Sequence, residues 1–215
     1  MKDSKTRLLE VALKLFATKG LDGVSTREIA QKAQVNISAI TYYFGGKESL
    51  YLAVLEYIKD ILKKDAADII KVLTYNKNLD DMSIKEAREI FLKAYSTILD
   101  TSFTPKNIYM SMILAKESVN PSAMAMKVFT EKMFPLSLEM KKLISKITGL
   151  PKNSKKTVII TETLLNQAVL FGRDKERIFM ILGLKKYDDK TKILIKGIVL
   201  NQVETLLNYY IKEKK

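Results

Sequence analysis

The chain has 215 residues and a formal charge of +13, and 47% of its residues are hydrophobic. It contains no cysteine and no histidine, which excludes disulfides and histidine-based catalysis and argues against zinc, so we expect no metal or other cofactor. The positive charge favours a polyanion such as double-stranded DNA. No apolar run is long enough to cross a membrane and the first ten residues lack an apolar signal region, so we expect a cytoplasmic protein with no membrane partner.

The carboxylate pairs Asp80-Asp81 and Asp188-Asp189 are the remaining candidates for acid–base chemistry. Both pairs stand beside residues that begin helices, where negative charge interacts favourably with the helix dipole. We therefore interpret them as capping and solvated groups, and we predict that the protein is not an enzyme.

After a first helix predicted at residues 4–19, the sequence indicates two short helices joined by a tight turn. Ser25 and Glu28 form an S-x-x-E capping box, in which the serine hydroxyl accepts from the Glu28 N–H and the glutamate reaches back to the cap. Asn36 is the expected N-cap of the second short helix, and Gly45-Gly46 ends it. Such a pair is typical of a helix-turn-helix, whose second helix enters the major groove of DNA.

The outward face of the second short helix separates this prediction from an ordinary helix pair in a bundle. It carries hydroxyls, small apolar groups and an aromatic ring, namely Ile37, Ser38, Ala39, Thr41 and Tyr42, and no acidic residue occurs between Glu28 and Glu48. A merely solvated face would more often carry Glu and Lys. Hydroxyls, methyl groups and rings instead suit base edges, thymine methyls and phosphate oxygens.

Residues 5–55 resemble the N-terminal domain of the TetR family of transcriptional repressors. The family pattern is met by Thr26, Ile29, Ala30, Ala33, Val35, Ile40, Phe44, Lys47 and Leu50. The resemblance implies phosphate contacts from Thr26, Tyr42, Tyr43 and Lys47. It places Arg27, Ser38 and Ala39 nearest the base edges, with Ile37 and Thr41 in the same interface.

Three positions depart from the family pattern. Gln34 replaces the turn glycine, so a positive φ there would cost energy. Thr41 replaces the usual tyrosine, and Ser38 stands where the family has a small residue. The last two departures imply a different operator sequence, or a phosphate contact moved to Tyr42 and Tyr43.

The rest of the chain is also predicted to be helical, which gives an all-α protein in three parts: a DNA-binding domain at 1–47, a connecting helix at 48–75, and an effector-binding and dimerisation domain at 76–215. A second capping box at Ser83 and Glu86 begins a helix that ends near residue 101. Further helices are predicted from Pro105, from Pro121 to Gly149, and at 154–171, 174–182 and 188–212.

The stretch downstream of residue 80 is similar to the C-terminal domain of the CecR-like (YbiH-like) TetR subgroup. The shared features are a glutamate before a proline helix start, at Glu117 and Pro121, and an aromatic-proline break at Phe134-Pro135. This resemblance covers about 100 residues.

Methionines and aromatic residues cluster between residues 82 and 135. They can fill a core with adaptable side chains, or they can line an apolar effector pocket in residues 85–175, as the family resemblance implies. The candidate effector-binding residues are Phe91, Tyr95, Tyr109, Met110, Ile113, Glu117, Phe129, Met133 and Phe171.

Two apolar stripes at helical spacing mark the last two long helices. Either stripe could pack internally, but in the family these helices pair across a two-fold axis, which would place two recognition helices on one operator. The candidate dimer-interface residues are Ile160, Leu164, Gln167, Ala168 and Phe171 on one helix, and Ile195, Val199, Gln202, Leu206 and Tyr209 on the other.

The leading hypothesis from the sequence is a homodimeric repressor that binds a palindromic operator and is released by a small, largely apolar effector. An alternative keeps DNA binding but replaces the small molecule with a protein partner. A third hypothesis is a ligand carrier or enzyme with a vestigial helix-turn-helix, which the missing His and Cys and the intact Arg27, Tyr42 and Lys47 disfavour.

Overall fold

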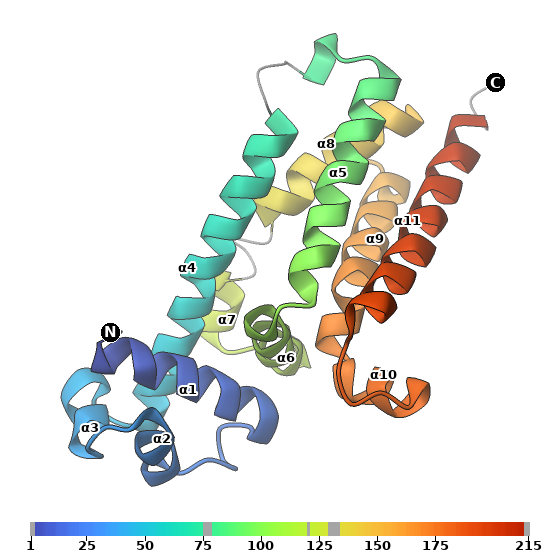
Figure 1. Ribbon diagram of the computed structural model, residues 1–215. Helices are drawn as coiled ribbons and strands as arrows, with labels where there is room; N and C mark the ends of the chain where they lie inside the picture. The colour runs from blue at the N-terminus through green and yellow to red at the C-terminus, as the bar shows by residue number, and fades with distance from the viewer. Residues whose placement is uncertain (1–2, 75–78, 120, 129–133, 213–215) are drawn as a thin grey trace.

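The computed structural model describes residues 3–74, 79–119, 121–128 and 134–212, and within these ranges the chain is helical (Figure 1). The all-α prediction is therefore confirmed. The N-terminal part contains α1 (Ser4–Lys19), α2 (Thr26–Ala33) and α3 (Ser38–Phe44), followed by the long α4 (Lys47–Thr74) and a 3-10 turn at Leu79–Asp81. None of the described helices is long and apolar enough to cross a membrane.

Side-chain caps set where these first helices begin. The Asp3 carboxylate accepts from the backbone N–H of Thr6 at 2.7 Å and begins α1. The Ser25 hydroxyl accepts from the Glu28 N–H at 3.1 Å and begins α2. The second half of the predicted capping box is wrong for α2, because the Glu28 carboxylate pairs with lysine side chains instead of reaching back to Ser25.

The turn between α2 and α3 places Gln34 in the left-handed region, with φ 55° and ψ 49°. Gln34 has the only positive φ outside glycine among the described residues. This backbone allows the Gln34 N–H to donate to the carbonyls of Ala30 and Gln31, and the chain then turns sharply into α3. A residue with a Cβ pays roughly 1–2 kcal/mol for this conformation, which is why a glycine suits the position better.

The C-terminal part contains α5 (Ile84–Ser102), α6 (Pro105–Val119), α7 (Ala123–Val128), α8 (Phe134–Thr148), α9 (Lys155–Arg173), α10 (Lys175–Leu182) and α11 (Asp189–Lys212). The capping box at Ser83 is complete, since the Ser83 N–H donates to Glu86 Oε2 at 2.9 Å and the Glu86 N–H donates to Ser83 Oγ. The single helix predicted from Pro121 to Gly149 is wrong, because α7 and α8 are separate helices there.

Two cores hold the fold together. The N-terminal core joins α1, α2, α3 and the first half of α4, and it also takes Met110 and Ile113 from α6. The C-terminal core joins α5, α8, α9 and α11 and takes Ile69 from the far half of α4. In Figure 1, α1–α3 lie at one end of the molecule and α4 runs from them alongside the upright C-terminal helices. Thus α4 and α6 both connect the two parts.

Candidate nucleic-acid interface and ligand cavity

The second short helix of the turn, α3, is anchored from one side and open on the other. Its Ile40 side chain is buried in the N-terminal core. Tyr42 is 82% exposed and Tyr43 40% exposed, and their rings meet edge to face with centroids 5.0 Å apart. Ser38 and Thr41 are exposed as well. The helix therefore presents hydroxyls and two rings to solvent, which is the surface that major-groove contacts require.

Asn36 begins α3, although not at the usual N-cap position. Its Oδ1 accepts from the Ser38 N–H at 3.0 Å and from the Ser38 hydroxyl at 2.8 Å. The bond spans two residues, and the helix begins at Ser38 after one turn residue, Ile37. The Ser38 hydroxyl proton is thereby used within the protein, so the oxygen faces outward as an acceptor.

The other predicted DNA-binding residues frame α3. Arg27 is exposed in the first turn of α2, where Thr26 is half-buried. Lys47 begins α4 directly after the glycines that end α3. Ile37 is exposed and Ala39 half-buried on α3 itself. The nine predicted residues thus lie at the start of α2, on α3 or directly before it, and at the start of α4.

One salt bridge holds α2 against α1, and a second lies within α2. The Glu28 carboxylate pairs with Lys19 Nζ at 2.8 Å and with Lys32 Nζ at 3.1 Å. These two ammonium groups hold the pKa of the Glu28 carboxyl below its usual value. The pairing orients the N-terminus of α2, which carries Thr26 and Arg27.

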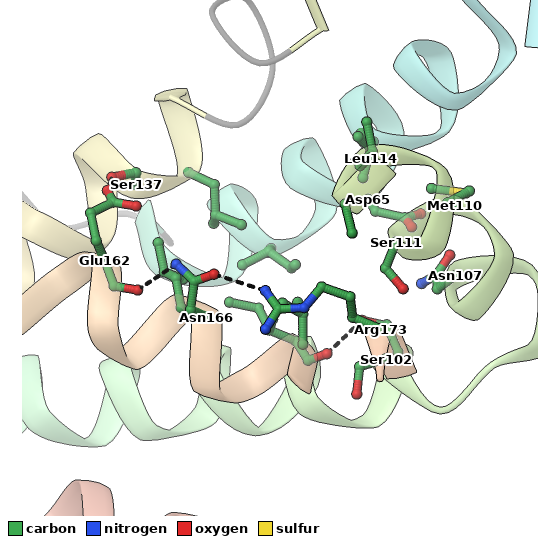
Figure 2. A pocket seen from close by; sticks show the side chains of 18 of the residues that line it. Asp65, Ser102, Asn107, Met110, Ser111, Leu114, Ser137, Glu162, Asn166 and Arg173 are labelled. Atoms are coloured by element: carbon green, nitrogen blue, oxygen red, sulfur yellow. Dashed lines mark hydrogen bonds between the residues drawn. The ribbon is translucent and has the colours of Figure 1, made fainter. Parts of the chain in front are cut away.

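A cavity of about 600 Å³ lies where the two cores meet (Figure 2). Its walls come from α4, α5, α6, α8 and α9, and they are mostly apolar, with Leu62, Ile98, Met110, Leu165 and Val169 among them. The polar lining consists of Asp65, Thr101, Ser102, Asn107, Ser111, Ser118, Ser137, Glu162, Asn166 and Arg173. This size and this lining are typical of a site for a drug-sized ligand.

The predicted effector residues lie mostly elsewhere, and Met110 alone of the described ones lines the cavity. Phe91 and Tyr95 fill the C-terminal core, where the Tyr95 hydroxyl donates to the Leu164 carbonyl at 2.9 Å and burial raises its pKa. Ile113 lies in the N-terminal core. Phe129 and Met133 lie outside the described residues.

The remaining three predicted effector residues take part in packing and polar contacts. Tyr109 packs on the N-terminal core with Lys175 Nζ over its ring. Glu117 is buried and hydrogen-bonded, and Phe171 packs on the C-terminal core. Sequence reasoning missed the polar residues of α9, although Glu162, Asn166 and Arg173 stand at i, i+4 and i+11 and so share one helical face.

One helix, α6, forms both a cavity wall and a contact with the N-terminal core. At its end Lys116 Nζ donates to the Ala17 carbonyl of α1 at 2.8 Å. The next residue, Glu117, accepts from the Tyr51 hydroxyl of α4 at 2.6 Å and from the Ser122 N–H at 2.9 Å. Burial and this carboxylate raise the pKa of Tyr51. A shift of α6 would therefore move α1 and α4.

The apolar stripes predicted as a dimer interface require a correction. Ile160, Leu164 and Ala168 of α9 and Ile195 and Val199 of α11 are buried in the C-terminal core of their own chain. Since they are already buried, they cannot supply apolar area to an interface between chains. The periodicity of these residues is explained by burial within one chain, and the dimer surface itself stays a prediction.

The other predicted interface residues occupy the edges of this contact. The Gln167 and Gln202 carboxamides join α9 to α11 at 2.6 Å. Phe171 and Leu206 pack against the C-terminal core, whereas Tyr209 is exposed. A different stripe of α11 faces solvent, with Leu194 62% and Ile198 51% exposed.

An exposed second helix, a tight α2–α3 turn and a helical part with a cavity define a DNA-binding transcriptional regulator of the helix-turn-helix class. Residues 8–54 match the family model of bacterial regulatory proteins, tetR family. The chain is 30% identical over 207 residues to the HTH-type transcriptional dual regulator CecR of Shigella flexneri, covering 95% of this chain and 91% of that protein. The chain therefore belongs to the TetR family, and its similarity to CecR extends over 95% of its length.

Solved structures agree in fold. The crystal structure of AibR in complex with isovaleryl coenzyme A and operator DNA matches with a TM-score of 0.64 at 14% identity, over 93% of this chain and 97% of that one. A putative TetR-family regulator from Mesorhizobium loti matches with a TM-score of 0.60 at 18% identity, over 96% of both chains. At these identities the matches show a shared fold.

Proposed function

We propose that the protein is a ligand-responsive transcriptional repressor of the cytoplasm, which binds a palindromic operator as a homodimer and is released by a small, largely apolar effector. The observation that carries this proposal is the position of the cavity. Its walls include Leu62 and Met110 of the N-terminal core and Ile69 and Ile98 of the C-terminal core. A ligand between the two cores can change how they sit against each other.

The route from the cavity to DNA runs through α6. Asn107, Met110, Ser111 and Leu114 of this helix line the cavity, and Lys116 and Glu117 at its end hold α1 and α4. A ligand that prefers one position of α6 would favour one spacing of the two recognition helices in a dimer. Operator release then follows as a shift between two states.

The cavity also favours a small molecule over the alternative of control by a protein partner, which would need no apolar cavity inside the fold. AibR, which shares this fold, was crystallised in complex with both isovaleryl coenzyme A and operator DNA. CecR is named a dual regulator. If this protein also activates some genes, release from DNA by the effector would lower their transcription instead of raising it.

Operator selection tests the DNA-binding half of this proposal. We expect the purified protein to select from random DNA a palindrome whose half-sites lie about one helical turn, roughly 34 Å, apart. Binding should weaken steeply with salt because phosphates are neutralised by basic side chains. Equal affinity for the selected and the random DNA would contradict the proposal.

Assembly is tested by a pair of charged substitutions. The exposed stripe of α11 with Leu194 and Ile198 is the proposed dimer surface, so Ile198→Glu should give a folded monomer by sedimentation with weakened operator binding. The matched control is Leu164→Lys, which buries a charge inside one chain. It should lower the Tm of thermal unfolding rather than yield a folded monomer. A wild-type protein that is monomeric at micromolar concentration would exclude the dimer.

A further inference from the structure

The hydroxyl groups that line the cavity have already used their protons. Thr101, Ser102, Ser111 and Ser118 each donate to a carbonyl three residues earlier in their own helix, at 2.7–2.9 Å. The Ser137 hydroxyl donates to Glu162 Oε1 at 2.6 Å. A ligand therefore finds these five groups only as acceptors. Donors must come from the other polar residues.

Arg173 is the principal open donor. Its Nε donates to Asp174 Oδ1 and its Nη1 to Asn166 Oδ1, each at 3.1 Å. Among the described residues, Nη2 has no partner. Two hydrogen bonds therefore hold the plane of the guanidinium while the Nη2 group stays open. Figure 2 shows the side chain along the floor of the cavity beside Asn166. The Asn107 carboxamide, at the α6 end of the cavity, also has no side-chain partner among the described residues.

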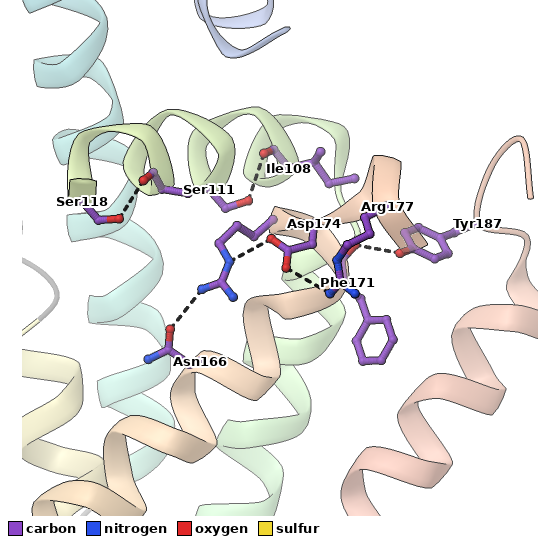
Figure 3. Close-up of polar contacts among 10 residues, drawn as sticks. Ile108, Ser111, Ser118, Asn166, Phe171, Asp174, Arg177 and Tyr187 are labelled. Carbon is purple, nitrogen blue, oxygen red and sulfur yellow. Dashed lines mark hydrogen bonds and ion pairs between the residues drawn. The ribbon is translucent and has the colours of Figure 1, made fainter. Parts of the chain in front are cut away.

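The nearest carboxylate does not neutralise this arginine alone. Asp174 Oδ2 also accepts from Arg177 Nη2 at 3.3 Å, so one carboxylate faces two guanidinium groups (Figure 3). The three side chains carry a net positive charge at the cavity floor. A carboxylate beside Arg173 would accept from the open Nη2 group in a charge-assisted hydrogen bond.

Two other carboxylates limit how much negative charge the cavity accepts. Glu162 lies with Ser137 at one end, and Asp65 of α4 lies near Ser111 and Leu114 at the other, with Arg173 between them (Figure 2). A ligand with one carboxylate at Arg173 keeps apolar groups against these ends. A ligand with a second negative charge would place it nearer to half-buried Asp65 or exposed Glu162, and like charges repel.

We propose that the cavity binds a largely apolar molecule with a single carboxylate, which Arg173 holds, and that Asp65 and Glu162 exclude phosphate esters and other polyanions. This inference rests on the proposed effector role of the cavity and names the chemical class of the effector. It sets the chain apart from the coenzyme A ester in the AibR complex, which carries several phosphate charges.

Binding to the full chain without DNA tests the chemical class. The neutral fluorophore N-phenyl-1-naphthylamine would serve as the probe. Its displacement would be titrated separately with decanoate, decanol, decylammonium, decyl phosphate and isovaleryl coenzyme A. We expect decanoate to displace it at least 10-fold more tightly than each of the others. Arg173→Gln should weaken decanoate about 10- to 100-fold, the range for a lost hydrogen bond between charged groups, and should change decanol less than 3-fold.

Matched variants keep the test decisive. Arg177→Gln removes the neighbouring arginine, which does not line the cavity, and leaves Asp174 to Arg173 alone. It should therefore weaken decanoate, but by less than Arg173→Gln does. Arg173→Lys keeps the charge without the planar fork, so it should fall between wild type and Arg173→Gln and preserve the fold if glutamine does not. Asp65→Asn and Glu162→Gln should each strengthen decyl phosphate binding.

The outcomes separate this inference from the proposed function. Tighter binding of decylammonium, with loss on Asp65→Asn, would show that the cavity takes a cation and would overturn the inference. Equal binding of decanoate and decanol would overturn it too. Preferential decanoate binding that leaves operator affinity unchanged would instead contradict the repressor mechanism and keep the carboxylate site.

Discussion

The N-terminal core and the cavity region use similar helices in opposite ways. Around α1–α3, Leu8, Phe16 and Ile29 are at most 1% exposed and leave α3 in one position. Between α4, α6 and α9, the apolar side chains stand back from one another and line a partly open cavity of about 600 Å³. The first arrangement fixes a surface that must fit DNA. The second arrangement is less densely packed and leaves room for a ligand. Helices α4 and α6 contribute to both the N-terminal core and the cavity.

Leucine truncation in the two regions would give the largest contrast. Leu8→Ala should destabilise the protein by about 3–5 kcal/mol, because it leaves a void in a packed core. Leu114→Ala should cost less than about 1.5 kcal/mol, because the half-buried leucine already borders the cavity and removes less area from water. Denaturant unfolding measures both. Equal losses would contradict the claim that the two regions are packed differently.

DNA-binding variants would divide the exposed surface into general and sequence-specific contacts. Arg27→Ala should change the preference between operators by about 1–3 kcal/mol if Arg27 contacts a base edge. Lys47→Ala should weaken all DNA sequences similarly and reduce the dependence on salt by about one phosphate contact. Fluorescence anisotropy with the operator and with random DNA separates the effects. Identical behaviour of the two variants on both DNAs would refute this division.

The turn at Gln34 offers a smaller and opposite effect. Gln34→Gly should stabilise the protein by about 0.5–1 kcal/mol, because glycine adopts a φ of 55° without the steric cost, less its own entropy loss. The control Gln31→Gly lies inside α2, where glycine should destabilise by about 0.5–1 kcal/mol. Thermal unfolding of the two variants should therefore shift in opposite directions. A loss of stability in Gln34→Gly would mean that the glutamine side chain compensates for the strain.

The smallest expected effect is the pH dependence of the α1–α2 salt bridges. Hydrogen bonds from Lys19 and Lys32 lower the pKa of Glu28 in the folded state, so its stabilising contribution is present above the unfolded pKa of about 4.3 and is lost as the pH falls through the lower folded value. Glu28→Gln should be slightly less stable than wild type at pH 7, and the difference should vanish in acid. In a background with Lys19→Gln and Lys32→Gln it should have no effect; a persistent difference there would point to another partner.

The same contrast decides what the sequence could predict. Caps act over three residues, so Ser25, Ser83 and Asp188 placed helix starts to within one or two residues. The exposed residues of α3 could be predicted from the family motif, because the motif is also a pattern of residues close together in the sequence. The motif predicted that Tyr43 faces DNA, and the apolar spacing predicted that Ile40 faces the core.

Long-range packing could not be predicted in this way. The periodicity of Leu164 and Val199 indicated a buried face, but it does not say whether the covering helix belongs to the same chain or to a second one. The methionine and aromatic cluster likewise indicated an apolar interior, yet the cavity is framed by α4 and α9 residues such as Asp65 and Arg173 that are distant in sequence. Only the three-dimensional arrangement brings them together.

The central claim is that the cavity and the operator are coupled, and reciprocal affinity measurements test it most directly. Operator affinity would be measured with and without saturating ligand, with decanoate and decanol as first probes, and ligand affinity with and without operator. We expect both affinities to fall by the same factor, between about 10- and 100-fold, which is about 1.4–2.7 kcal/mol of coupling. A ligand that fills the cavity with equal affinity for the free and the operator-bound protein would contradict it.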